Sequence, residues 1–173
     1  MTLDFLLTSL IVVATPGTGV LYTLAAALSR GSRASVIAAV GCTLGIVPHL
    51  IAAIVGLTAV LQASAVAFST LKYVGVAYLI YLAWSTLREH GALRVERTPR
   101  TRSALEVITT AVLVNLLNPK LSIFFFAFLP QFVSATESDP RAHLVTLSAV
   151  FMAMTLVVFV IYEIGRASCR ERV

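Results

Sequence analysis

The sequence predicts an all-α polytopic membrane protein, a helix bundle built as an inverted repeat of three-helix halves with the last helix missing. Three observations predict this fold class. The first is composition: 58% of the 173 residues are apolar and only 12% are charged, about half the charged fraction of a soluble domain. The second is the recurrence of apolar stretches of about 20 residues, the length that crosses a bilayer. The third is a pair of prolines that interrupt two of these stretches at corresponding positions.

Five stretches are predicted to cross the membrane, four of them outright and one around its interruption. They are Phe5–Leu28, Val36–Leu61, Val66–Leu87, Ala104–Phe132 and Leu144–Ile164. The first is not a secretory signal, because it lacks a basic start and its apolar run continues past any plausible cleavage site.

Basic residues gather on one side of this predicted topology. The segments that follow the first, third and fifth spans hold 10 of the 13 lysines and arginines. The positive-inside rule therefore predicts an N-terminus outside the cell and a cytoplasmic linker at Arg88–Ser103. The linker reads as a topology signal, or alternatively as a segment attracted to anionic lipid headgroups. No basic patch with interleaved aromatic residues indicates nucleic-acid binding.

The linker divides the chain into a first half at 1–87 and a second, incomplete half at 104–164, followed by an atypical polar tail at 165–173. Each half begins with a span that a proline interrupts, at Pro16 and Pro119, which are 103 residues apart. Corresponding spans are three apart, an odd number, so the halves should have opposite orientations. A matching second half needs a sixth span, so either the protein has five spans or its natural C-terminus is absent here.

The two interruptions are candidate binding positions. Proline has no N–H, so Pro16 frees the carbonyl of Val12 and Pro119 frees that of Asn115. In lipid each free carbonyl must find protein, water or a ligand. Two nearby glycines, Gly17 and Gly19, let the backbone leave the helix and expose N–H groups that suit a carboxylate. The alternative is that both prolines only kink their helices.

Lys120 lies in the middle of the fourth span, where a lysine costs about 2.5–3.5 kcal/mol to insert. Because of this cost we expect it to face a cavity or a partner. No carboxylate lies equally deep in the sequence to pair with it. Its ammonium would meet either a negative group of the substrate or the freed carbonyls. A purely structural role is the alternative.

The second span carries a GxxxG pair, Gly41 and Gly45, which allows another helix to approach closely. His49 is either a proton relay or a neutral histidine hydrogen-bonded across helices. Cys42 is interpreted as a small packing residue. No nucleophile elbow, metal-ligand spacing or phosphate loop appears in the sequence, so we expect neither an enzyme nor a cofactor.

Four motifs resemble the LysE/RhtB family of bacterial amino-acid exporters over residues 1 to about 164. They are TPGTGVLYTLAAALSRG, GIVPHLIAAIVGL, LKYVGVAYLIYLAW and NLLNPKLSIFFFAFLPQF. The resemblance implies a multi-pass inner-membrane protein of about six spans, acting as a homo-oligomer and driven by the proton gradient. The chain departs from the family where Pro16-Gly17-Thr18 replaces the usual Pro-Gly-Pro, and where a sixth span would follow.

The sequence therefore predicts an exporter of a small amino acid or derivative, with membrane lipid as its other partner. Backbone donors at Gly17–Gly19 and the Lys120 ammonium would receive the carboxylate, while the freed carbonyls would receive the substrate ammonium. A metal-ion exporter and a non-transporting scaffold or assembly factor are the alternatives; Cys42 and His49 make a poor metal-ligand set. The predicted site residues are Pro16, Gly17, Thr18, His49, Asn115, Asn118, Pro119 and Lys120.

Overall fold

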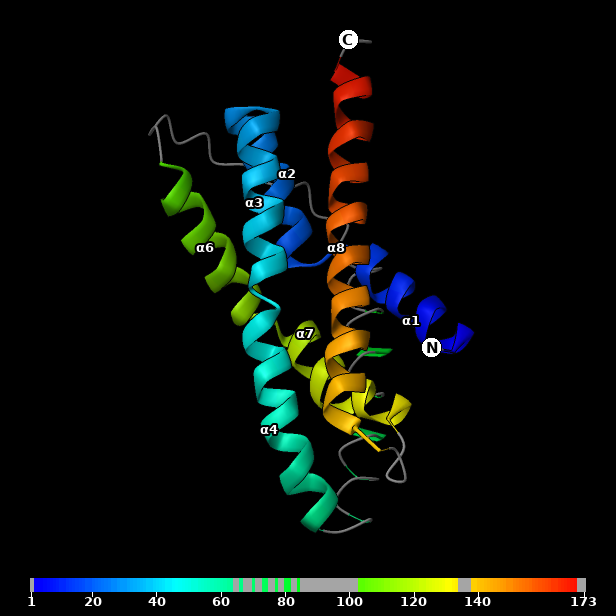
Figure 1. Ribbon diagram of the computed structural model, residues 1–173. Helices are drawn as coiled ribbons and strands as arrows, with labels where there is room; N and C mark the ends of the chain where they lie inside the picture. The colour runs from blue at the N-terminus through cyan, green and yellow to red at the C-terminus, as the bar shows by residue number, and fades with distance from the viewer. Residues whose placement is uncertain are drawn as a thin grey trace.

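The computed structural model describes residues 2–63, 103–133 and 138–170, together with scattered helical positions between 66 and 84. Within these residues the secondary structure is helical and contains no strand (Figure 1). The predicted linker and most of the predicted third span lie outside the described residues. The chain is an all-α bundle, as the sequence predicts.

The first span is broken where the sequence predicts it. Helix α1 (Leu3–Ala14) and helix α2 (Thr18–Arg30) meet at an angle of 47°. Pro16 lies between them, and Gly17 caps α2 in an extended conformation. Because proline cannot donate to the carbonyl four residues back, the helix stops before it.

The second span consists of α3 (Ser32–Leu44) and α4 (Val47–Ala63), joined at Gly45 and Ile46. Gly31 has a φ of +81° and turns the chain between α2 and α3, a conformation that favours glycine. Pro48 lies in the first turn of α4, where its missing N–H would have no helical partner anyway.

The fourth predicted span is broken as well. Helix α6 (Ala104–Leu116) and the segment Pro119–Phe132 meet at 54°. That segment begins with the short helix α7 (Pro119–Ile123), continues as the π-helix η1 (Phe124–Phe128), and ends as the 3₁₀-helix η2 (Leu129–Phe132). The last helix, α8 (Pro140–Arg170), runs past Ile164, where the sequence predicted the span to end.

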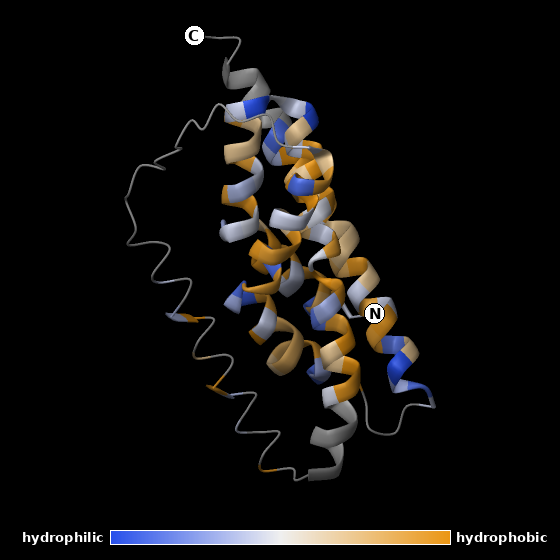
Figure 2. Cartoon of the chain, turned by 90° about the vertical axis from the view of Figure 1, so that its left-hand side faces the viewer, coloured by the Kyte–Doolittle hydropathy of each residue, from blue (hydrophilic) through white to orange (hydrophobic). Residues whose placement is uncertain are grey.

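The helices meet the requirements of a membrane bundle. Ser32–Gly56 and Pro140–Glu163 are each long and apolar enough to cross a membrane, and the two bent pairs raise the number of candidate spans to four among the described residues. Hydrophobic residues predominate along the helices (Figure 2), and many large ones, such as Ile11, Val55 and Val157, are exposed. These outward residues suit contact with lipid.

The two broken spans run in opposite directions (Figure 1). From α1 the chain rises through α2 to the end of the bundle at which α6 begins, whereas α6 and α7 descend from that end. The basic residues Arg30 and Arg33 lie at the same end, as does the C-terminal end of α8. Which side of the membrane this end faces stays a prediction.

The interior is held together by an aromatic cluster and by one close helix contact. Phe151 of α8 stacks on Phe124 with ring centroids 4.3 Å apart and meets Phe125 edge-on at 5.6 Å. On the other side of the bundle α3 packs against α6. A Cβ at Gly41 would lie 2.7 Å from the Ala111 Cβ, so the GxxxG pair does permit a close approach.

Candidate functional site

The two breaks meet in space through Lys120. Its ammonium donates to the carbonyl oxygens of Val12 and Thr15, at 2.9 Å each. The Val12 carbonyl is the one that Pro16 deprives of a helical partner. Both acceptors lie at the C-terminal end of α1, which carries the negative end of the helix dipole and attracts a cation.

Lys120 is aimed by the cap of α7. The Asn118 side chain accepts from the Lys120 backbone N–H at 3.1 Å, and Pro119 occupies the first helical position, where proline is favoured. Gly17 gives the ammonium room, because a Cβ there would lie 3.1 Å from Lys120 Nζ. The cap and the glycine together let the lysine reach the opposite break.

Asn115 joins the second break to the bend between α3 and α4. Its side-chain amide donates to the Cys42 carbonyl and its Oδ1 accepts from Asn118 Nδ2 at 3.5 Å. The Cys42 carbonyl needs this donor, because the Ile46 N–H donates to Thr43 instead. Three interrupted spans therefore converge on Asn115 and Lys120.

His49 lies against the Asn115 carbonyl, which Pro119 deprives of its α-helical donor and which also accepts from the Asn118 N–H at 3.1 Å. It is buried, and its Nε2 lies 3.1 Å from the Asn115 carbonyl oxygen. Because a carbonyl only accepts, this nitrogen carries the proton. The ring also stacks on Phe125, with centroids 6.1 Å apart. The geometry matches the interpretation of a histidine hydrogen-bonded across helices; the proton-relay role stays a prediction.

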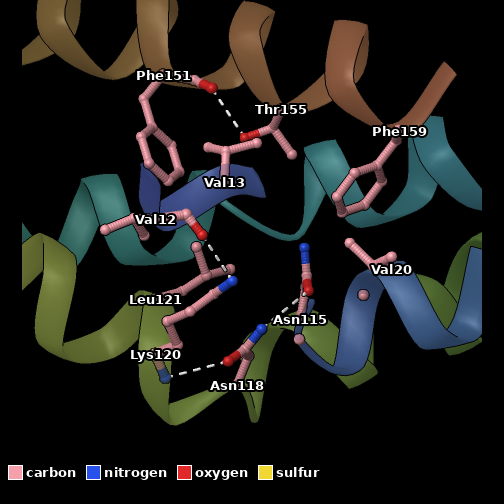
Figure 3. Close-up of a pocket in the computed structure, with 12 residues that line it drawn as sticks. Val12, Val13, Val20, Asn115, Asn118, Lys120, Leu121, Phe151, Thr155 and Phe159 are labelled. Carbon is pink, nitrogen blue, oxygen red and sulfur yellow. Dashed lines mark hydrogen bonds between the residues drawn. The ribbon is translucent and has the colours of Figure 1, made fainter. Parts of the chain in front are cut away.

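A small pocket lies between the two breaks and α8 (Figure 3). One side is polar, with Asn115, Asn118 and Lys120, and the other is made of apolar side chains. Its volume is about 20 Å³, roughly the room that one water molecule needs. The pocket could hold an amino acid only if the two breaks, or the breaks and α8, moved apart. The pocket is lined by Val12, Val13, Gly17, Gly19, Val20, Asn115, Asn118, Lys120, Leu121, Phe151, Thr155 and Phe159.

Four of the eight predicted site residues line this pocket: Gly17, Asn115, Asn118 and Lys120. His49 is not among the residues that line the pocket, but it is hydrogen-bonded to the backbone carbonyl of Asn115, which does line it. The other three, Pro16, Thr18 and Pro119, are exposed on the outside of the breaks. The two prolines shape the backbone, because each deprives a carbonyl of its helical donor.

The sequence-based prediction missed the contribution of α8. Phe151, Thr155 and Phe159 line the pocket from this helix, and their spacing of four residues places them on one helical face. That spacing, with one threonine among aromatic residues, was the available signal. Tyr162 also comes from α8, and its hydroxyl donates to the Ala14 carbonyl at 2.7 Å. It satisfies a third backbone group at the first break.

The freed carbonyls are not open to a ligand in this conformation. The sequence predicted that the carbonyls of Val12 and Asn115 would bind a substrate ammonium. In the structure the Val12 carbonyl accepts from Lys120, and the Asn115 carbonyl is hydrogen-bonded to His49. None of the described residues that line the pocket is acidic. Across the described part of the chain, no group of three or more His, Cys, Asp or Glu side chains could hold a metal ion.

Comparison with known proteins gives one family and several relatives. The family model for the LysE type translocator matches residues 10–172. A membrane protein of Vibrio cholerae is 34% identical over 135 residues, which cover 78% of this chain and 66% of that protein. The homoserine/homoserine lactone efflux protein of Salmonella typhimurium is 31% identical over 169 residues, covering 98% of this chain and 80% of the relative. The leucine efflux protein of the same species is 26% identical over 136 residues, covering 76% and 63%. No solved structure matches.

Proposed function

Since this chain belongs to the LysE type translocator family, we propose that it exports a small amino acid or amino-acid derivative. The observation that carries the proposal is the Lys120 ammonium, which lies inside the bundle at the junction of two broken spans and lines the pocket there. A charge at this depth is costly in a membrane and is expected where a polar ligand passes.

The pocket suits a zwitterion with a small side chain. The substrate carboxylate would lie between the Lys120 ammonium and the first N–H groups of α2, which begins at Thr18 beside the pocket. Those N–H groups lie at the positive end of a helix dipole. The substrate side chain would contact Val20 and Phe159. Because no acidic residue lines the described pocket, a second positive charge on the substrate would be unfavourable.

The names of two relatives support the same substrate class. One is described as exporting homoserine and homoserine lactone, and the other leucine. These compounds share a primary ammonium and a neutral side chain, and the lactone lacks a free carboxylate. The chain spans 66% and 80% of the first two relatives, so the transfer of an activity to it remains our proposal.

Transport would require the pocket to open alternately to the two sides. At about 20 Å³ it is too small for an amino acid in this conformation. We expect the two oppositely oriented broken spans to rock against each other about the Lys120 junction, the behaviour of inverted-repeat transporters. Coupling to the proton gradient, a multi-pass location in the bacterial inner membrane and homo-oligomerisation belong to the same proposal.

Uptake into inverted membrane vesicles tests the function. Vesicles that contain the chain should accumulate a labelled small neutral amino acid when the lumen is acidified, and a protonophore should abolish the uptake. Vesicles that contain the Lys120→Met variant at equal expression should accumulate no more than vesicles without the protein. The proposal fails if no amino acid or amino-acid lactone in a broad panel is accumulated, or if Lys120→Met transports normally.

A further inference from the structure

We propose that the carbonyl oxygens of Val12 and Thr15 form the ammonium-binding site of the carrier, with Lys120 as a tethered occupant that a substrate ammonium replaces. The inference rests on the proposed export function for the identity of the substrate. It differs from that proposal in giving Lys120 two successive positions, first on the carbonyls and then on the substrate carboxylate.

The site itself is two backbone carbonyls that point at one cation. Each oxygen lies 2.9 Å from Lys120 Nζ, the distance of a charge-assisted hydrogen bond. Pro16 removes the helical donor that Val12 would otherwise have, and α1 ends at Ala14. The dipole of α1 adds negative potential at the same point. Backbone geometry therefore creates the site, and it persists whichever cation fills it.

A substrate ammonium has the same chemistry as the present occupant. The lysine side chain and an amino acid both present a compact primary ammonium with three N–H donors. Guanidinium, by contrast, is planar and larger. The ammonium of a free amino acid can therefore make the same two hydrogen bonds that the Lys120 ammonium makes.

The lysine can leave without disturbing the break. Its backbone is held by the Asn118 cap, while its four-carbon side chain is intrinsically flexible and can turn its ammonium toward another acceptor. A short movement across the pocket would carry the ammonium to a substrate carboxylate near the N-terminal end of α2. The carbonyls of Val12 and Thr15 would then be satisfied in both states, by lysine when the carrier is empty and by substrate when it is loaded.

The inference predicts selectivity for N–H donors. A primary ammonium can satisfy both carbonyls, whereas a quaternary ammonium carries the charge without a donor and an alcohol carries a donor without the charge. The test uses the Lys120→Ala variant, which leaves the carbonyls open. The missing part of the side chain, from Cγ to Nζ, corresponds to n-propylammonium. Lys120→Met is the matched control, because it removes the charge but keeps the space filled.

Thermal unfolding in detergent is measured for the wild type and both variants with n-propylammonium, tetramethylammonium or n-propanol. n-Propylammonium, at a concentration a few times its dissociation constant, should raise the midpoint for Lys120→Ala by about 2–4 °C. It should leave the wild type and Lys120→Met unchanged. The other two compounds should have no effect on Lys120→Ala beyond their effect on the wild type.

The inference is overturned if n-propylammonium does not stabilise Lys120→Ala selectively, or if tetramethylammonium stabilises it equally. If Lys120→Ala is recovered unfolded, the compounds are added during solubilisation, and only n-propylammonium should restore a monodisperse peak on size exclusion. This readout does not depend on transport. Selective stabilisation without amino-acid uptake by the wild type would sustain the ammonium site and contradict the proposed function.

Discussion

Lys120 Nζ lies 2.9 Å from the carbonyl oxygen of Val12, a residue 108 positions earlier in the chain. A reciprocal contact exists at the other break, where His49 of α4 is hydrogen-bonded to the carbonyl of Asn115. Each carbonyl that a proline frees therefore binds a side chain from a distant part of the chain. This arrangement explains how two broken helices are tolerated in an apolar bundle, since unpaired carbonyls in lipid cost several kcal/mol each.

Replacing Lys120 by Met should abolish export without abolishing folding. The change removes two charge-assisted hydrogen bonds, each worth about 1.5–3 kcal/mol, and also removes an insertion cost of about 2.5–3.5 kcal/mol. These terms are comparable, so the variant should insert normally and lose only modest stability. Vesicle uptake should fall at least tenfold. The exposed cation at Arg141 provides the control: Arg141→Met should transport like the wild type, and a loss in both variants would argue against a specific role for Lys120.

Replacing Gly41 by Ala should destabilise the bundle. The new methyl group would lie 2.7 Å from the Ala111 Cβ and 3.0 Å from the Ile108 Cα, and backbone atoms cannot yield easily. Overpacking of this kind costs about 1–3 kcal/mol. Gly56→Ala is the matched control, because no atom lies within 4 Å of its new methyl group. Thermal unfolding in detergent should separate the two variants; equal midpoints would contradict the close contact of α3 with α6.

A glutamine at position 49 should preserve export, and a leucine should not. Glutamine can place an N–H donor where His49 Nε2 now meets the Asn115 carbonyl. Leucine removes this hydrogen bond, at a cost of about 0.5–1.5 kcal/mol, and leaves the carbonyl with the backbone N–H of Asn118 as a donor. The measurement is vesicle uptake as a function of the imposed pH gradient. If a folded His49→Gln variant loses its response to the gradient, the histidine relays protons and the capping account is insufficient.

The sequence predicts the breaks well, because proline and glycine act locally. The loss of the Val12 and Asn115 donors follows from Pro16 and Pro119 alone, and the structure places breaks at both sites. The depth of Lys120 within an apolar span likewise indicates an interior position without knowledge of its partners. The helical stretches of the other described spans follow from length and apolar composition.

What the sequence does not predict is which groups meet across the bundle. That Thr15 offers a second carbonyl, or that Asn115 donates to Cys42, depends on the rotation and closeness of helices distant in sequence. The outward direction of Thr18 depends on the extended geometry of Gly17. The pocket face of α8 was missed because Phe151 and Phe159 are ordinary membrane residues until their neighbours are known.

Replacing Phe159 by Ala should shift the substrate preference toward larger side chains. Its ring lines the pocket, and its tip lies 3.2 Å from where a Cβ at Gly19 would be. Removing the ring enlarges the apolar side of the pocket and leaves Lys120 untouched. Uptake of a bulky neutral amino acid relative to a small one should rise several-fold. Val157→Ala, on the exposed face of the same helix, should leave the ratio unchanged. An unaltered ratio in Phe159→Ala would remove this residue from the substrate site.

The central claim is that Lys120 bridges the two broken spans and is released by substrate, and solid-state NMR in lipid bilayers tests it most directly. The chain contains two lysines, Lys72 and Lys120, so ¹⁵Nζ-lysine labelling gives few signals, and the Lys120→Met variant assigns them. With ¹³C-carbonyl threonine, the account predicts dipolar dephasing of the Lys120 signal by the Thr15 carbonyl in the empty protein. It predicts that a saturating exported amino acid removes the dephasing. No dephasing in the empty protein, or dephasing that substrate leaves unchanged, would contradict it.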